Sequence, residues 1–314
     1  MKKVFIDGSE GTTGLRIFER FESRDDIELL KIPSELRKDP VEVKKYINES
    51  DITFLCLPDA AAREAVAMVE NENTIILDTS TAHRTEAGWA YGYPELSAAH
   101  REAIRTGKRI AVPGCYATGF ITTAYALAAG GILPKDYPVS AFAVSGYSGG
   151  GKKMIAQYQA QDKEKELSSA RLYALSQSHK HLKEMKAISG LERTPLFSPM
   201  VTDYYSGMTV SLTFYADMLN GKQTPETVRE YLAKHYAGEK FITVQPLGAE
   251  AESGGVLFSS ARSGWDGLEI YVTGNEERIM VTTRFDNLGK GASGAAIQCM
   301  NIVLGCEEDK GLTV

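Results

Sequence analysis

The sequence has little of what marks a secreted, membrane or nucleic-acid-binding protein. Its four cysteines in 314 residues include no C-x-x-C pair, which is too few for a disulfide scaffold and argues against a structural zinc site. No apolar run reaches the ~18 residues of a membrane span, and no apolar signal-peptide core follows the initial MKKVFIDG. With 35 Lys and Arg against 41 Asp and Glu, the net charge of −6 does not attract nucleic acid. We expect a reduced, cytoplasmic protein that binds a small molecule and no metal.

The first 115 residues alternate between short apolar strands and helices. Strands are predicted at residues 4–6, 27–32, 52–57, 74–77 and 109–112, and helices at 12–22, 40–47, after 59 and at 95–105. Asp39 and Asp59 are predicted to cap the second and third helices. Nearly continuous apolar strands separated by helices favour a parallel sheet covered on both faces. We therefore predict an α/β, doubly wound Rossmann-type domain over residues 1–115.

The pattern changes after Gly131. Strands are predicted at residues 139–145, 209–215, 269–273 and 279–284, and helices at 152–161, 172–188, 224–236 and 292–304. Long strands with few helices between them favour a second domain of the α+β class, with a mixed or antiparallel sheet, over residues 116–286.

A glycine turn follows the first predicted strand and opens the first helix. Gly8, Gly11 and Gly14 have the spacing G-x-x-G-x-x-G. Glycines there let the backbone approach a pyrophosphate, and the helix N-terminus offers amide N–H groups to it. Thr12 and Thr13 add hydroxyl groups. The context of strand and helix favours a dinucleotide site over a plain structural turn.

The segment after the second strand bears on which dinucleotide binds. Ser34, Arg37 and Lys38 suit a 2′-phosphate and favour NADP, whereas Glu35 would suit the ribose diol of NAD. The basic pair and the hydroxyl favour NADP, although Arg37 and Lys38 would also suit a solvated loop.

Cys115, in the segment PGCYATG, has a context unlike those of the other cysteines. Cys56, Cys299 and Cys306 lie among apolar neighbours and are expected to pack as small hydrophobes. Cys115 follows a Pro-Gly turn and precedes a predicted helix over residues 117–129. A helix N-terminus favours thiolate over thiol. We therefore interpret Cys115 as a nucleophile rather than a buried, inert cysteine.

The sequence contains one close pair of histidines, His179 and His181. It lies in the predicted helix 172–188, where side chains two residues apart do not share a face. One histidine would then reach the site as a base while the other points elsewhere. The alternative is a basic surface helix that includes Lys180 and Lys183.

Two further segments suit anionic groups of a substrate. Arg84 follows the fourth strand in the segment STAHR, so it is expected at the carboxyl edge of the sheet. The glycine-rich segment 145–152 contains Ser145, Gly146, Tyr147 and Lys152. It resembles a phosphate cradle without Walker spacing, and its alternative interpretation is a flexible linker.

Six segments of the chain together resemble one enzyme family. They are DGSEGTTG, STAHR, YGYPEL, PGCYATG, SGYSGGGK and DNLGKGASGAAIQCMN, and they resemble the shorter class of N-acetyl-γ-glutamyl-phosphate reductases, within the semialdehyde dehydrogenase superfamily. The resemblance implies NADP, a nucleophile at Cys115 and a histidine base. It also implies that a terminal helix, 287–305, completes the cofactor domain and brings Asn287, Lys290 and Gly291 near the nicotinamide.

The chain departs from the family where the base is expected. Longer members carry H-R-H-x-P-E, whereas this chain has HKHLKE without the proline. By position in the motif we favour His181 as the base, with His179 orienting it or binding substrate. The resemblance further implies a homodimer or homotetramer assembled through the second domain.

The implied reaction is the NADPH-dependent reduction of N-acetyl-γ-glutamyl phosphate to N-acetylglutamate 5-semialdehyde and phosphate, through a cysteine thioester, in arginine biosynthesis. Three other functions stay open from the residues. An aspartate-semialdehyde-type dehydrogenase would use the same chemistry, a cysteine hydrolase would need no hydride, and an NADP-sensing regulator would need no reactive thiol.

Overall fold

The computed structural model describes all of residues 1–314, and the chain divides into two compact units. Unit 1 consists of Met1–Gly114 and Ala292–Thr313, and unit 2 of Cys115–Gly291 together with Val314. The expected first domain, residues 1–115 with the terminal helix 287–305, differs from unit 1 at both places where the chain passes between the units. Cys115 and residues 287–291 lie in unit 2 instead.

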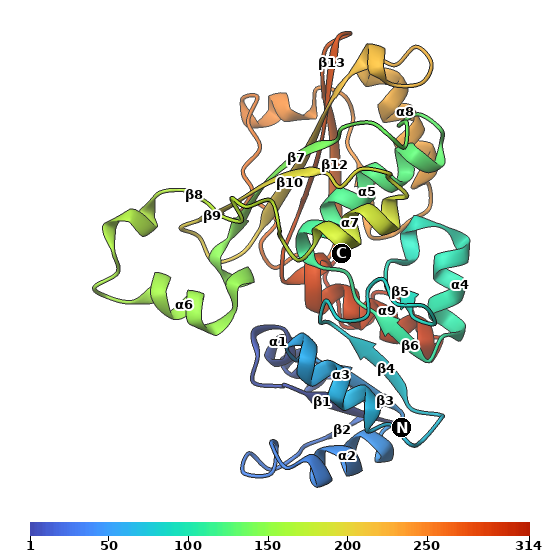
Figure 1. Cartoon of the computed structure of the whole chain (residues 1–314), viewed down its shortest axis with the longest axis vertical. Helices are drawn as coiled ribbons and strands as arrows, with labels where there is room; N and C mark the ends of the chain where they lie inside the picture. Colours follow the sequence, from blue (N-terminus) through green and yellow to red (C-terminus); the bar gives the residue numbers. More distant parts are fainter. The chain divides into compact units, whose positions relative to one another are not determined.

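Unit 1 contains a parallel sheet with helices (Figure 1). Its strands are β1 (Lys2–Asp7), β2 (Ile27–Leu30), β3 (Ile52–Leu55), β4 (Ile75–Asp78), β5 (Ala90–Tyr91) and β6 (Arg109–Ala111), and its helices are α1 (Thr12–Phe21), α2 (Pro40–Glu49), α3 (Asp59–Ala67), α4 (Ala98–Thr106) and α9 (Gly294–Leu304). The order β2-β1-β3-β4-β6-β5, with every pairing parallel, confirms the doubly wound prediction. The prediction missed β5, which has only two residues and therefore no periodic pattern.

Both faces of this sheet are buried, which explains its apolar strands. Val4 and Ile6 of β1 join a core cluster with residues of α1, α4 and α9. Phe5, between them, joins a second cluster with residues of α2 and α3. Successive strand residues point to opposite faces, so a sheet covered on both sides needs apolar residues at every position.

The predicted helix starts are confirmed at one position and wrong at another. Asp39 caps α2, accepting a hydrogen bond from the Val41 amide at 2.9 Å. Asp59 is instead the first residue of α3, and its carboxylate binds the amide and the hydroxyl of Thr81. A carboxylate just after a strand can bind a neighbouring strand's loop instead of its own helix. The helix predicted from residue 95 begins at Ala98, because Ser97 caps it.

Unit 2 is built on a seven-stranded mixed sheet, which confirms the α+β prediction. Its strands are β7 (Ser140–Gly146), β8 (Arg171–Leu172), β9 (Leu196–Thr202), β10 (Met208–Tyr215), β11 (Ile242–Val244), β12 (Leu268–Gly274) and β13 (Arg278–Phe285), and its helices are α5 (Cys115–Ala129), α6 (Gly151–Gln159), α7 (Leu182–Ser189) and α8 (Pro225–His235). The strand order is β11-β12-β13-β10-β7-β9-β8. The sequence prediction missed β8, β9 and β11. β9 contains Pro199, a residue that argues against a strand interior, and the other two are short.

The helix predicted at residues 172–188 is wrong over its first half. Helix α7 begins at Leu182, and residues 173–181 form a loop between β8 and α7. Ala174 and Gln177 in this loop have φ of +53° and +55°, the only positive values among the non-glycine residues. Such values interrupt a helix, so the histidine pair lies in a loop of defined conformation.

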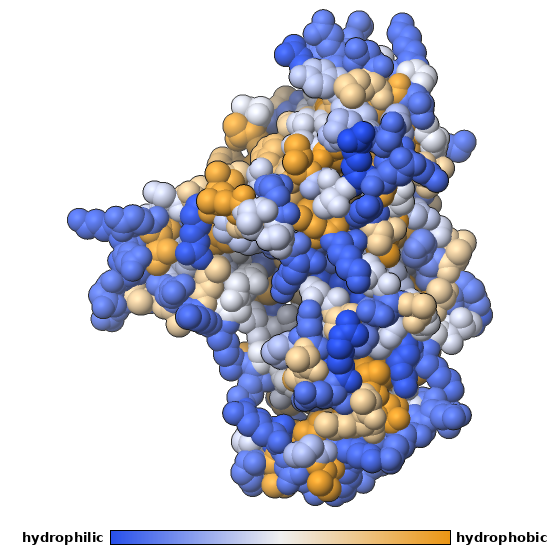
Figure 2. Space-filling view, in the orientation of Figure 1, coloured by the Kyte–Doolittle hydropathy of each residue, from blue (hydrophilic) through white to orange (hydrophobic).

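One face of the unit 2 sheet carries helices and the other presents apolar side chains. Helices α5 and α8 contact strands β10, β12 and β13, and α7 packs beside α5. On the alternate positions of the strands, Phe142, Leu196 and Tyr215 are 40%, 59% and 60% exposed. In the space-filling view hydrophobic atoms gather over β8 and β9 (Figure 2). No helix of the chain is both long enough and apolar enough to span a bilayer.

Candidate active site

The glycine turn of unit 1 is sterically closed to larger residues. Gly8 has φ of +82°, and a Cβ added there would clash with the Cys56 carbonyl oxygen. A Cβ at Gly14 would clash with the carbonyl oxygen of Gly8, which also accepts a hydrogen bond from the Gly11 amide at 2.9 Å. These contacts make glycine necessary at both ends of the turn.

The start of α1 has features that suit an anion. No side chain caps this helix, and the hydroxyl oxygen of Thr12 is buried without a hydrogen-bond partner. A buried hydroxyl without a partner is costly unless a ligand satisfies it. Thr13 follows it in the first turn of the helix. This end of α1 therefore fits the pyrophosphate of a dinucleotide.

The basic segment after β2 reaches the glycine turn through an ion pair. The Arg37 guanidinium pairs with the carboxylate of Glu10, which lies inside the turn. Ser34 and Lys38 are exposed on the same segment. The structure thus brings Arg37, one of the three residues predicted to select NADP, to the glycine turn within unit 1.

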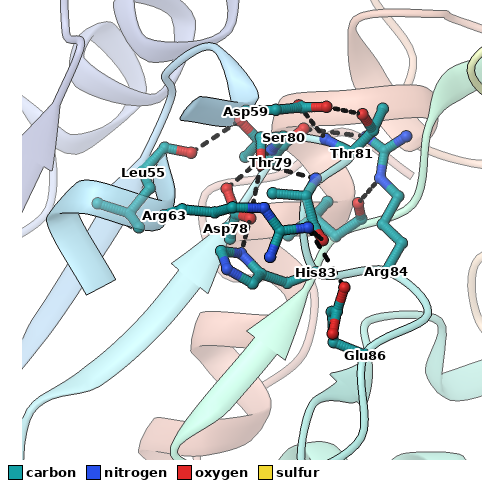
Figure 3. A network of polar contacts seen from close by, with 12 residues as sticks. Leu55, Asp59, Arg63, Asp78, Thr79, Ser80, Thr81, His83, Arg84 and Glu86 are labelled. Carbon is teal, nitrogen blue, oxygen red and sulfur yellow. Dashed lines mark hydrogen bonds and ion pairs between the residues drawn. The ribbon is translucent and has the colours of Figure 1, made fainter. Parts of the chain in front are cut away.

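A polar network holds the loop that follows β4 (Figure 3). The fully buried Asp78 carboxylate lies 2.6 Å from Nδ1 of His83 and accepts bonds from the amide and hydroxyl of Ser80 at 2.9 and 2.7 Å. The His83 ring stacks on Trp89 with centroids 4.1 Å apart. The contacts of His83 with Asp78 and Trp89 therefore stabilise the loop after β4.

Arg84 is buried at the carboxyl edge of the sheet, as predicted. Its Nε donates to the carbonyl oxygen of Val112 at 2.8 Å, and its Nη2 donates to that of Thr79 at 2.9 Å. These bonds tie the loop after β4 to the segment that leads from β6 toward Cys115. In the structure Arg84 orders this edge, and its contact with substrate stays a prediction.

Cys115 is the first residue of α5 and is half-buried. The N-terminus of a helix stabilises a thiolate through its partial positive charge and its amides. A π-helical turn, Gly289–Ser293, lies against it: a Cβ at Gly291 would come within 2.9 Å of the Cys115 Cβ. Only a glycine allows this approach.

The other two C-terminal candidates are buried within unit 2. Lys290 is 1% exposed, and its ammonium lies 5.0 Å from the centroid of the Phe241 ring. The Asn287 amide donates to the Ser148 hydroxyl at 3.0 Å and accepts from the Gly207 amide at 2.9 Å. These contacts hold the turn against the rest of unit 2.

An aromatic cluster that the sequence analysis missed lies beside Cys115. The ring of Tyr116 lies 6.3 Å from that of Tyr173, 5.7 Å from His179, 6.0 Å from His181 and 5.3 Å from Phe197. Burial raises the pKa of Tyr173, and the nearby charge of Cys115 raises it further. Tyr116 is adjacent to Cys115 in the sequence, whereas Tyr173 carried no sequence signal.

The two histidines lie together in this cluster, contrary to the expectation that they would face apart. Their ring centroids are 4.8 Å apart. Nδ1 of His179 accepts a hydrogen bond from the His181 amide at 3.1 Å, and its Nε2 lies 3.4 Å from the Tyr173 hydroxyl. Burial, with the charge of Lys180, lowers the pKa of His179 to about 4. The ring is therefore neutral at pH 7 with its proton on Nε2, because Nδ1 acts as an acceptor.

The glycine-rich segment at residues 145–152 is an ordered turn between β7 and α6, not a flexible linker. The Gly146 amide donates to the Gly207 carbonyl oxygen at 3.0 Å, and the Tyr147 ring stacks on that of Tyr158 at 4.6 Å. Ser145 is buried and its hydroxyl donates to the Gly146 carbonyl oxygen at 3.1 Å. Burial raises the pKa of Tyr116, and the nearby Ser145 hydroxyl offsets part of that rise. Lys152 is exposed in the first turn of α6. Ser145 therefore adjoins the cluster beside Cys115.

No group of three or more His, Cys, Asp or Glu side chains in the chain is arranged to hold a metal ion.

Comparison with known proteins identifies the family. Residues 3–105 match the family model "Semialdehyde dehydrogenase, NAD binding domain", and residues 115–287 match "Semialdehyde dehydrogenase, dimerisation domain". N-acetyl-gamma-glutamyl-phosphate reductase 2 of Nostoc sp. is 43% identical over 318 residues, covering 99% of each chain. The chain belongs to the N-acetyl-γ-glutamyl-phosphate reductase family. The Brucella ovis reductase is also 43% identical, over 96% of this chain and 99% of its own.

Solved structures of more distant relatives show the same fold as this member of the reductase family. Aspartate semialdehyde dehydrogenase from Francisella tularensis superposes with a TM-score of 0.73 at 14% identity, covering 97% of this chain and all of its own. Aspartate semialdehyde dehydrogenase from Candida albicans, solved with NADP, superposes with a TM-score of 0.65 at 15% identity, covering 97% of this chain and 98% of its own. Both superpositions show the same fold, a parallel-sheet unit followed by a mixed-sheet unit.

Proposed function

We propose that the protein is an NADP-dependent N-acetyl-γ-glutamyl-phosphate reductase of arginine biosynthesis. It reduces the acyl phosphate to N-acetylglutamate 5-semialdehyde and releases phosphate. The observation that carries the proposal is the cluster of Cys115, Tyr116 and the histidine pair. It supplies a helix-start thiol and an imidazole in a chain of this family.

The Cys115 thiolate attacks the acyl carbonyl, and the C–O bond to phosphate breaks, leaving a thioester. The Cys115 amide, at the start of α5, is a donor for the oxyanion that forms, a contact worth roughly 3 kcal/mol. NADPH, when bound, supplies the hydride that reduces the thioester. Collapse of the thiohemiacetal then releases the aldehyde and regenerates the thiolate.

His181 is the better base of the pair. The Nδ1 of His179 is used by the His181 amide, and its Nε2 faces Tyr173. His179 therefore holds the backbone of His181, whereas the buried His181 ring faces Tyr116. His181 keeps the thiol deprotonated and returns a proton when the intermediate resolves.

The dinucleotide would be held by the glycine turn at residues 8–14, with Thr12 and Thr13 at its pyrophosphate. Ser34, Arg37 and Lys38 would take the 2′-phosphate. Arg84, Ser145, Gly146, Tyr147 and Lys152 are the proposed contacts to substrate, and Asn287, Lys290 and Gly291 those to the nicotinamide end.

Replacing both Arg37 and Lys38 by alanine is expected to lower the preference for NADP over NAD by roughly tenfold or more, because two charge-assisted contacts to the 2′-phosphate are lost. The measurement is kcat/KM with each cofactor. Lys45→Ala, an exposed charge change on α2 of the same unit, is the control and should leave the ratio unchanged. A double variant with the wild-type ratio would show that the basic pair is a solvated loop.

The activity is tested in the oxidative direction. Wild-type protein should reduce NADP with N-acetylglutamate 5-semialdehyde only when phosphate is present. Preference for aspartate semialdehyde would reassign the substrate, and hydrolysis of a thioester without cofactor would point to a hydrolase. An NADP-binding protein inactive with both aldehydes would be a sensor.

We further propose a homodimer or homotetramer assembled through the exposed sheet face of unit 2, where Phe142, Leu196 and Tyr215 lie. The "dimerisation domain" description of the model matching residues 115–287 supports this. The four free cysteines fit a cytoplasmic enzyme.

A further inference from the structure

The loop at residues 173–181 carries three members of the cluster beside Cys115, yet it has no regular secondary structure. Tyr173 opens the loop, and His179 and His181 close it. Within it, Ala174 and Gln177 adopt left-handed backbone conformations that side chains with a Cβ disfavour. Something in the surrounding structure must hold this conformation.

The Gln177 side chain provides such a hold. Its Nε2 donates to the Phe197 carbonyl oxygen at 2.8 Å, and its Oε1 accepts from the Phe197 amide at 2.9 Å. The amide thus binds both backbone groups of one residue of β9, as a neighbouring strand would.

The position of this contact continues the pairing of β8 with β9. Arg171 and Leu172 pair with Val201 and Met200, and the Tyr173 amide donates to the Pro199 carbonyl oxygen at 3.2 Å. The backbone then leaves β9, and the Gln177 amide satisfies the next exposed edge of that strand.

Phe197, whose backbone binds the Gln177 side chain, also belongs to the aromatic cluster beside Cys115. Its ring lies 5.3 Å from the ring of Tyr116 and 5.3 Å from that of His179. Because Gln177 is two residues from His179, one amide fixes the distance between the histidine loop and the strand beneath it. The titratable rings beside His179 are those of Tyr116 and Tyr173. The charge of Lys180 acts on His179, and the charge of Cys115 acts on Tyr173.

We propose that Gln177 is a positioning residue of the reductase, whose side-chain amide clamps the loop 173–181 to β9 and thereby sets His179 and His181 against Cys115. This inference rests on the proposed roles of Cys115 and His181. The clamp touches neither substrate nor cofactor and acts through the two histidines.

Two variants test the clamp. Gln177→Ala removes both bonds, and Gln177→Glu keeps the shape but turns the donor to Phe197 into a repelling oxygen. Gln161→Ala, an exposed glutamine beyond α6, is the matched control. We expect kcat to fall about tenfold in Gln177→Ala, with an unchanged thermal midpoint and unchanged KM for NADP, because misplacement of a base lowers the rate without weakening cofactor binding.

A second measurement reports the effect of the loop on Cys115 without relying on turnover. Cys115 alkylation by iodoacetamide, followed by mass spectrometry as a function of pH, reports the thiolate fraction. We expect its midpoint to rise by about one pH unit in Gln177→Ala and Gln177→Glu, because a displaced histidine stabilises the thiolate less. Gln161→Ala should match the wild type in both measurements.

Wild-type kcat and alkylation profiles in both Gln177 variants would overturn the inference, and so would a loss of activity that only follows a lowered thermal midpoint. An inactive wild-type protein would instead reject the proposed function. The alkylation profiles distinguish these failures, since they depend on the loop and Cys115 whatever the substrate.

Discussion

Cys115→Ser is expected to lower reductase turnover by roughly 10⁴-fold or more, because a serine hydroxyl at a helix start is far less ionised than a thiol and cannot form the thioester. NADP binding should persist, since the glycine turn lies entirely in unit 1 and Cys115 in unit 2. Turnover with N-acetylglutamate 5-semialdehyde, phosphate and NADP measures the first effect. Fluorescence titration with NADPH measures the second.

The control for this variant is Cys306→Ser. Cys306 is also half-buried, but it lies near the carboxylate of Asp26 in unit 1 and has no proposed role. It should retain wild-type turnover. Wild-type turnover in Cys115→Ser would remove the assignment of the nucleophile.

His181→Asn is expected to lower kcat by about 10²- to 10⁴-fold, the usual contribution of a general base. His179→Asn should lower it by only about tenfold, because the asparagine oxygen can replace Nδ1 as acceptor for the His181 amide while the contact to Tyr173 is lost. Steady-state kinetics of both variants over pH 5 to 9 tests whether His181→Asn lowers kcat more than His179→Asn does.

The pH profile adds an independent test of this assignment. His179 has its pKa lowered to about 4, so it stays neutral across this range and its loss should leave the shape of the profile unchanged. Loss of His181 should change the acidic limb. The reverse order of effects, with His179→Asn the more damaging variant, would identify His179 as the base.

The sheet of unit 1 and the place of Cys115 could be predicted because both depend on local pattern. Strands buried on both faces must be apolar at every position, as Val4, Phe5 and Ile6 show. A Pro-Gly turn before an apolar helical run marks the start of α5, and the glycine turn needs residues without a Cβ. Steric limits on the backbone and the period of apolar residues depend on neighbouring residues. Both can therefore be recognised in the sequence.

The histidine site could not be predicted in this way. The stretch 172–188 has helical periodicity, but Gln177 turns the backbone left-handed and binds Phe197, twenty residues further along the chain. Two other contacts between residues distant in sequence could not be predicted either. Gly291 packs against Cys115, and Asp59 binds Thr81 instead of capping its own helix. The sequence alone therefore determined the fold class, the glycine turn and the place of Cys115 at a helix start. Tertiary structure decided how the histidines, Tyr173 and Gln177 are placed, because hydrogen bonds between residues distant in sequence override local preference.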